Sequence, residues 1–476
     1  MPNPSVDDGA GGKLQGFRYP WKRAAMSPAL TSADGLPLTA DLEPLVQRVL
    51  DAAQAAGATQ AEASLSHSRG LSVSVRKGEV ESLEFQRDRG LSMTVYFGHR
   101  KGSASTGDLS DGGIRQAVEA ACAIARLTEE DPFSGLADAA RLATRFPDLQ
   151  LDHPWDVTAD QAIELARACE AAALATDARI TQSEGAGLST QRGVSIYANS
   201  HGFVGRRSGT QHSLSCAVIA AESNGNMQRD YWYDGNRNAA LLDDAAAIGR
   251  RAGERTVARL GARRLSTRTA PVLFVPQMAR GVFGHLIGAI SGAALYRRAS
   301  FLLDHLDKPV FSPIVTLEQQ PFIPGASSSS AFDQEGVATS QRVLVEAGVL
   351  RGWLLGSYSA RKLGLATTGN AGGVYNLVAS HGTQGFDELI RDMGEGLVVT
   401  ELMGQGVNGV TGDYSRGAAG FWVENGQIAY PVENATIAGN LLDIYQRIVA
   451  LGADVDTHAN IRCGSMLVEA MQIAGE

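Results

Sequence analysis

Nine histidines are the residues of this chain best suited to holding a catalytic metal: His67, His99, His153, His201, His212, His285, His305, His381 and His458. A zinc peptidase usually places two histidines on one helix face, about three to five residues apart, beside a glutamate that serves as general base. The closest pair here, His201 and His212, lies too far apart in sequence for one helical face. The sequence therefore predicts that this chain cannot build a paired-histidine zinc site by itself.

Nucleophilic side chains offer a second kind of chemistry. No GxSxG elbow is present, and the polar cluster Asp413–Arg416 has no histidine near it in sequence. The cysteines Cys122, Cys169, Cys216 and Cys463 form no CxxC pair, which argues against a thiolate zinc clip and a disulfide framework. A self-contained hydrolase that uses Ser415, Asp413 or Cys463 stays open as an alternative, with a triad assembled from distant parts of the chain.

Charge and hydropathy limit the partners of the chain. Its 476 residues carry a formal net charge of -9, and its basic residues occur only as short clusters such as Arg206-Arg207. Nucleic-acid binding usually requires a contiguous basic patch, so direct nucleic-acid contact is not expected. The apolar stretch from Gly281 to Tyr296 is too short to span a bilayer, and residues 1–38 contain no apolar signal segment. We therefore expect a cytoplasmic protein without membrane contact.

The elements that must position a site follow a pattern that occurs twice. Helical periodicity over 39–57 and 111–127 brackets alternating, strand-length segments, and the same order recurs between helices at 158–176 and 239–260. Glycine-containing turn clusters at 68–70, 88–90 and 191–193 divide these segments into short strands. The pattern predicts two similar units, each made of helices and an antiparallel meander.

The remainder of the chain is richer in strands. A glycine-rich apolar segment at 278–295 predicts one helix, and a further helix is expected near 435–450. Asn425-Gly426 lies between alternating segments and predicts a type I′ hairpin. The serine run Ser327–Ser330 predicts a mobile loop.

These observations predict an α+β fold in which N-terminal helix/antiparallel-meander units are followed by a β-rich C-terminal domain. The expected divisions are a loose N-terminal tail at 1–38, a first α+β unit at 39–130, a second at 150–262, and the β-rich domain at 268–476.

Three stretches in the last domain are dense in glycine and polar residues. They are GVFGHLIGAISG with the following YRRAS, SYSARKLG with the following TGNAGG, and TELMGQGVN with the following TGDYSRGAAGF. Most single glycines in such stretches serve turns and close packing, and a lone His285 is more often a core histidine than a ligand.

Together, and in this order, the three stretches resemble the PmbA branch, also called TldE, of the TldD/PmbA family. Further matching motifs are YRRASFLLD, FWVENGQIAYPV, TIAGNLLDI and NIRCGSM, so the resemblance covers residues 40–476. It implies a cytosolic TldD–TldE heterodimer that acts as a metallopeptidase. The implied substrates are unfolded peptides, including antitoxins and the leader peptides of microcins.

The resemblance also implies which residues of a zinc site are missing. In the TldD branch two histidines and a cysteine hold zinc, and a glutamate serves as base. His285 matches the first histidine and Cys463 the cysteine, but Leu286 stands at the glutamate position and Ile290 at the second histidine position. Since zinc needs about three protein ligands, we expect no catalytic residue and no metal in this chain, with zinc in the TldD partner.

Under this interpretation the chain completes the substrate cavity and supports the partner's active site. The candidate cavity or structural residues in its motifs are Asp413, Tyr414, Ser415, Arg416, Arg361 and Asn370. A homodimer is possible without the partner. Apart from the self-contained peptidase, one more alternative remains, a non-enzymatic protein that modulates DNA gyrase, as an older description of the family has it.

Overall fold

The computed structural model describes residues 35–475 of the chain. The predicted tail at 1–38 therefore lies almost wholly outside the described residues. Of its last four residues, Leu36 is buried. No helix in the described range combines the length and apolar character needed to cross a membrane.

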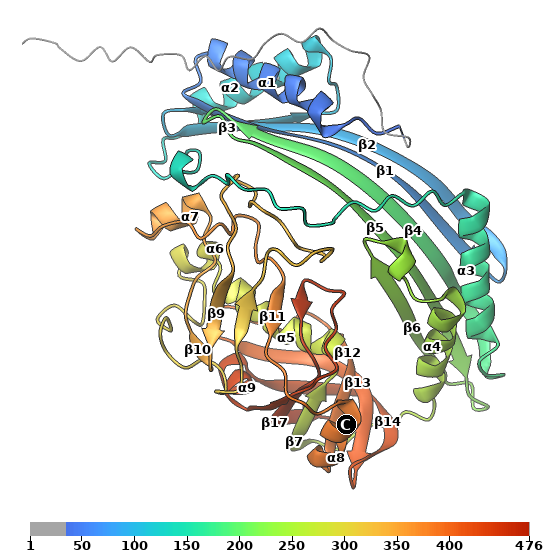
Figure 1. Ribbon diagram of the computed structural model, residues 1–476. Helices are drawn as coiled ribbons and strands as arrows, with labels where there is room; N and C mark the ends of the chain where they lie inside the picture. The colour runs from blue at the N-terminus through green and yellow to red at the C-terminus, as the bar shows by residue number, and fades with distance from the viewer. Residues whose placement is uncertain (1–34, 476) are drawn as a thin grey trace, which may run out of the picture.

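One long, curved antiparallel sheet makes up the N-terminal half (Figure 1). Its strand order is β3-β2-β1-β4-β5-β6. The strands are β1 (Gln60–Arg76), β2 (Glu79–Phe97), β3 (Arg100–Thr106), β4 (Ile180–Asn199), β5 (Val204–Ala221) and β6 (Met227–Asn236). The two predicted units each contribute three neighbouring strands, and the pairing of β1 with β4 joins them.

The predicted turns at 68–70, 88–90 and 191–193 are wrong, because continuous strands run through them. The glycines of these clusters lie within paired strands of the sheet: Gly70 pairs with Gln191, Gly90 with Ser66, and Gly193 with Gly209. A glycine inside a strand often marks a bend, and a band of them across four strands permits the curvature seen in Figure 1. The meander therefore consists of few long strands rather than many short ones.

Four helices cover one face of the sheet and leave the other face polar. They are α1 (Thr39–Ala55), α2 (Asp111–Leu127), α3 (Ala159–Leu174) and α4 (Ala245–Ala258). Apolar side chains on alternate positions of β1, such as Leu65 and Val73, are buried beneath them in two separate clusters. The intervening positions of β1 carry mostly serines, which face the concave side of the sheet.

The C-terminal part lies on that concave side (Figure 1) and confirms the predicted β-rich domain. Its larger sheet has the order β14-β13-β12-β7-β17-β15, and β14 also pairs with β17, which closes a ring of five strands. These strands are β7 (Arg268–Phe274), β12 (Gly396–Met403), β13 (Asp413–Glu424), β14 (Gln427–Asn440), β15 (Ile448–Leu451) and β17 (Met466–Ala474). The hairpin at Asn425-Gly426 connects β13 and β14, as predicted.

A smaller sheet and short helices complete this domain. The sheet contains β8 (Leu317–Gln319), β9 (Arg342–Glu346), β10 (Val349–Leu350), β11 (Leu377–Ala379) and β16 (Ile461–Arg462). The helices are α5 (Pro276–Ala289), α6 (Gly292–Tyr296), α7 (Ser357–Lys362), α8 (Phe386–Met393) and α9 (Leu441–Gln446).

Two predicted helices of this domain differ from the structure. The segment 278–295 is divided into α5 and α6, because the Ser291 side chain caps a new helix. The segment 435–450 begins as the end of β14, where Thr436 and Ile437 pair with both β13 and β17, and only Leu441–Gln446 is helical. Long-range strand pairing thus overrides the local helical periodicity.

Candidate functional site

Helix α5 carries the residues that the resemblance connects with metal binding. Leu286 and Ile290 are both 0% exposed and belong to the large C-terminal core cluster. His285 is half-buried, and its ring packs edge-to-face on Tyr414 with 5.9 Å between ring centroids. Burial, with Arg416 nearby, lowers the pKa of His285, so its imidazole is neutral at pH 7.

Cys463 lies at the other end of α5. Its Sγ is 3.8 Å from the carbonyl oxygen of Pro276, the first residue of the helix. Nine residues separate Pro276 from His285, which corresponds to roughly 13 Å along the helix axis. Burial and the neighbouring Asp456 raise the pKa of the Cys463 thiol to about 12, which keeps the sulfur protonated and a poor metal ligand.

A zinc ion does not fit the side chains around α5. Within residues 35–475, no three His, Cys, Asp or Glu side chains gather closely enough to hold a metal. The positions where a glutamate and a second histidine would stand are filled by apolar side chains that point into the core. The donor set therefore lacks both the ligands and the base that hydrolysis with zinc requires.

The motif Asp413–Arg416 shapes the start of β13. Asp413 accepts a hydrogen bond from the Thr411 hydroxyl at 2.6 Å, and Arg416 Nε donates to the Met403 carbonyl at 3.1 Å. Ser415 is exposed, and its amide donates to the Gly406 carbonyl. Tyr414 is buried with its hydroxyl unpaired, and burial raises its pKa to about 12. Although no histidine is near this motif in sequence, the fold brings His285 onto the ring of Tyr414.

Arg361 and Asn370 hold loops together. The Arg361 guanidinium donates to the carbonyl oxygens of Phe133, Gly135 and Leu136, and so ties α7 to the segment that follows α2. The Asn370 amide donates to Gln319 Oε1 at 2.7 Å and to the Gly373 carbonyl at 2.8 Å, while its oxygen accepts from Arg342 and Thr368. Arg361 therefore braces the C-terminal domain against the N-terminal half, whereas Asn370 holds loops together within the C-terminal domain.

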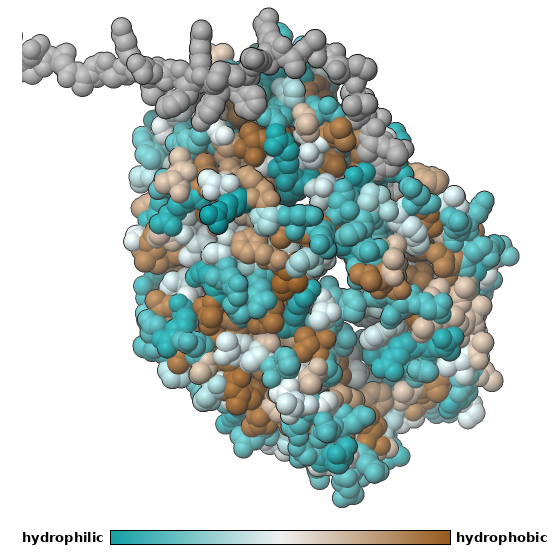
Figure 2. Space-filling view, viewed as in Figure 1, coloured by the Kyte–Doolittle hydropathy of each residue, from teal (hydrophilic) through white to brown (hydrophobic). Residues whose placement is uncertain are grey.

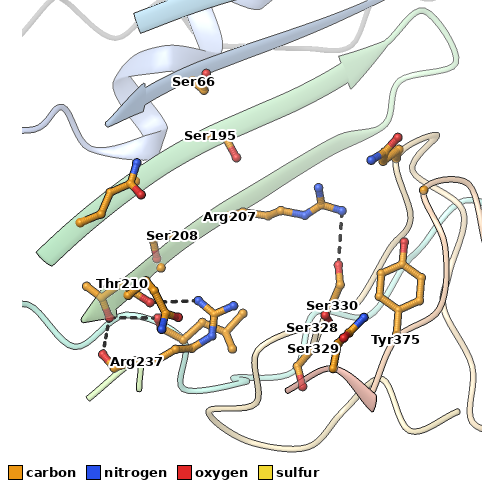
Figure 3. A pocket seen from close by; sticks show the side chains of 18 of the residues that line it. Ser66, Ser195, Arg207, Ser208, Thr210, Arg237, Ser328, Ser329, Ser330 and Tyr375 are labelled. Carbon is orange, nitrogen blue, oxygen red and sulfur yellow. Dashed lines mark hydrogen bonds between the residues drawn. The ribbon is translucent and has the colours of Figure 1, made fainter. Parts of the chain in front are cut away.

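A cavity of about 750 Å³ lies between the concave face of the sheet and the C-terminal domain. Its walls come from β1, β4, β5, the end of α5 and the loops 328–330 and 372–375. Figure 3 shows Arg207 extending from β5 across this space toward Ser330. The outer surface is hollowed near the centre of the view in Figure 2, and its apolar residues are scattered rather than gathered in one patch.

Sequence reasoning missed this cavity, although one signal for it exists. The serines of β1 alternate with buried apolar residues, which marks a polar face. The loop Ser327–Ser330 was predicted to be mobile, yet Ser329 donates to the Ile323 carbonyl at 2.5 Å and Ser330 to the Phe332 carbonyl at 2.6 Å. These bonds anchor the loop where Ser328, Ser329 and Ser330 line the cavity, and its mobility stays a prediction.

Asp333, next to the same loop, gives a pH-dependent prediction. It is 0% exposed, and its carboxylate accepts from the amides of Glu335, Val337 and Ala371. Burial raises its pKa from 3.8 to about 6. Because the folded state favours the protonated carboxyl, the contribution of Asp333 to stability is fully present below about pH 4. This contribution is lost as the pH rises through about 6, and the loss amounts to up to about 3 kcal/mol.

We therefore expect the unfolding free energy of the wild type, relative to Asp333→Asn, to fall between pH 4 and pH 6.5. Urea unfolding at several pH values measures this difference. The exposed Asp387→Asn on α8 is the charge-matched control. A wild-type minus Asp333→Asn difference that stays constant over this range contradicts the prediction.

Known protein families and relatives match this chain over nearly all of its described residues. Models of the PmbA/TldA metallopeptidase match in three consecutive parts: domain 1 at 61–125, the central domain at 152–260 and the C-terminal domain at 267–475. Metalloprotease PmbA of Escherichia coli O157:H7 is 51% identical over 417 residues, which cover 87% of this chain and 92% of that protein. A metalloprotease TldD homolog of Haemophilus influenzae is 24% identical, covering 81% of this chain and 84% of that protein.

Solved structures share the fold. A Bacteroides thetaiotaomicron protein described as a modulator of DNA gyrase superposes with a TM-score of 0.88 at 29% identity, covering 92% of this chain and 99% of that one. TldE from Thermococcus kodakarensis superposes with a TM-score of 0.79 at 20% identity, covering 90% and 100%. The chain therefore belongs to the PmbA/TldD metallopeptidase family, within its PmbA/TldE branch.

Proposed function

We propose that this chain is the non-catalytic subunit of a heterodimeric metalloprotease, paired with a TldD-type subunit that holds the zinc. The complex degrades or trims unfolded peptides of the antitoxin and microcin-leader type, in the cytoplasm. The observation that carries the proposal is the full burial of Leu286 and Ile290, where a catalytic helix would present a glutamate and a histidine. The similarity to proteins named for both PmbA and TldD supports a pairing within the family.

In this proposal the chain contributes a wall of the substrate space. The concave face of the sheet is long and polar, and a cavity separates it from the C-terminal domain. Such a face suits an extended peptide without regular structure. The hairpin around Asn425-Gly426 offers strand edges that could add a peptide by main-chain hydrogen bonds. Zinc, bound in the partner, would supply the activated water, and this chain's residues would bind and orient the peptide.

One alternative has a specific observation in its favour. The solved Bacteroides relative is described as a modulator of DNA gyrase, so an interaction protein without peptidase function is a second candidate. The net charge of -9 makes direct DNA contact unfavourable but permits contact with a protein. A homodimer is the state we expect when the TldD-type subunit is absent.

The test compares the purified chain with the chain co-expressed with a TldD-type subunit. Both are incubated with an unfolded peptide, with and without a chelator, and cleavage is followed by mass spectrometry. We expect cleavage only by the co-complex, and only without chelator. Chelator-sensitive cleavage by the chain alone would support the self-contained peptidase instead. Stable capture of gyrase without any cleavage would support the second candidate.

A further inference from the structure

The cavity under the curved sheet has a positive lining, although the chain as a whole is acidic. Arg207 and Arg237 line it, and no aspartate or glutamate is among its described lining residues. Neither arginine has a carboxylate oxygen within 4.0 Å in the described part of the chain. In a protein with 51 acidic residues, two arginines without a carboxylate partner facing one cavity form an unusual arrangement.

The contacts of the two arginines leave Arg207 available. Arg237 donates to the carbonyl oxygens of Thr210, Ala326 and Ser327, so each of its three nitrogens holds the wall. Arg207 uses Nη2 for the Ser330 hydroxyl and for the Phe332 and Asp333 carbonyls, while its Nε is buried without a partner. The nearby Asp333 carboxylate accepts from backbone amides instead. Within the described residues neither arginine forms a close ion pair, although Arg207 stacks on the Phe332 ring at 4.0 Å and feels the charge of the nearby Asp333.

Neutral donors surround these charges. The hydroxyls of Ser66, Ser195 and Ser208 have no hydrogen-bond partner in the described residues, and Figure 3 shows all three on the sheet side of the cavity. Ser66 is exposed and Ser195 and Ser208 are half-buried, so their hydroxyls are open to the cavity and free to donate to a ligand. A carboxylate suits these donors, since it accepts several hydrogen bonds and matches the planar guanidinium.

We propose that this cavity binds a carboxylate of the substrate peptide, with Arg207 as its main charge partner and the hydroxyls of Ser66, Ser195 and Ser208 as further donors. The proposal rests on the peptide substrate proposed above and adds a chemical preference to it. The carboxylate comes from either the C-terminus or an acidic side chain, both of which present the same group. A volume of about 750 Å³ accommodates this group together with neighbouring residues of the peptide.

Fluorescence anisotropy with three labelled versions of one unstructured peptide tests the proposal. The first has a free C-terminal acid and no acidic side chain, the second is its C-terminal amide, and the third is the amide with one internal glutamate. Each is titrated into the full chain alone and into the chelated complex with its TldD-type partner. We expect the free acid, the glutamate peptide or both to bind about ten-fold more tightly than the plain amide. The pattern distinguishes the two sources of the carboxylate.

Charge variants connect the preference to the cavity. Ser195→Asp places a negative charge on its sheet wall, and Arg207→Gln removes the main positive charge. Both should weaken binding of the carboxylate peptides about ten-fold and leave the plain amide unchanged. Ser189→Asp is the matched control, because Ser189 is exposed on the same strand and face but lies six residues away, roughly 20 Å. That distance exceeds the screening length in physiological salt, so affinity should change less than two-fold.

Equal binding of all three peptides, or unchanged carboxylate affinity in a folded Ser195→Asp variant, would overturn the proposal. Arg207 braces the loop Ser330–Asp333, so thermal unfolding must accompany its variant, whereas Ser195→Asp removes no contact. The carboxylate preference and the proposed peptidase function can fail independently of each other. Cleavage by the complex without any carboxylate preference rejects only this inference, and a carboxylate preference in a complex that cleaves nothing rejects only the peptidase role.

Discussion

Replacing Leu286 with glutamate and Ile290 with histidine should unfold the C-terminal domain rather than create a peptidase. Both side chains are 0% exposed in the core that also contains Phe283 and Trp422. Losing a buried leucine costs about 2–5 kcal/mol, and an unpaired buried carboxylate adds several more. The sum is about 6 kcal/mol, which is comparable to the whole stability of many domains. Urea unfolding and zinc analysis of the double variant measure the result.

The control for this variant lies on the same helix. Gly281→Glu introduces the same charge at an exposed position of α5, where a new side chain would meet no atom within 4 Å. We expect this variant to stay within about 1 kcal/mol of the wild type, since surface substitutions have small effects. A double variant that remains folded, binds zinc and cleaves peptide would show that the core can open to a metal site, contrary to the proposed role.

The second large effect is expected at Glu170, a glutamate of α3 that is 1% exposed. Its two carboxylate oxygens accept hydrogen bonds from the amides of Lys77 and Gly78, each at 2.8 Å. Lys77 and Gly78 have φ values of 54° and 77° and form the turn between β1 and β2. Glu170→Ala removes both charge-assisted bonds and should lower the unfolding free energy by about 4 kcal/mol.

Denaturant unfolding measures this loss, and hydrogen exchange should place it at the β1–β2 turn. Glu164→Ala is the matched control on the same helix, because Glu164 is 70% exposed and forms an exposed ion pair with Arg167. An exposed pair of this kind contributes less than about 1 kcal/mol. Equal stability of the two variants would mean that Glu170 does not hold the turn.

The helices of the N-terminal half could be predicted closely, because apolar periodicity is a local signal. The strands could not, since a glycine such as Gly70 or Gly193 has the same local appearance in a turn as in a bend of a long strand. Only the pairing with neighbouring strands distinguishes the two cases. The end of β14 was mistaken for helix for a similar reason, because its partners in β17 lie more than thirty residues further along the chain.

The candidate site was also predictable only where its signal is local in the sequence. The composition of α5 was readable from the motif, and burial of Leu286 and Ile290 follows from their apolar character. The cavity was not readable, because it brings together Ser66, Ser195 and Arg207 from three strands with the loop Ser328–Ser330. No local pattern connects segments so far apart in the chain. The unpaired Nε of Arg207 is likewise evident only from the folded arrangement.

The most direct test of the central claim is the zinc content of the co-purified complex when this chain carries His285→Ala and Cys463→Ala together. We expect about one zinc per heterodimer and wild-type cleavage if, as proposed, the partner subunit binds the metal. Elemental analysis beside an activity assay gives both values for one sample. Loss of zinc from a complex that remains folded and assembled would contradict the account, since His285 and Cys463 would then be ligands of the catalytic metal.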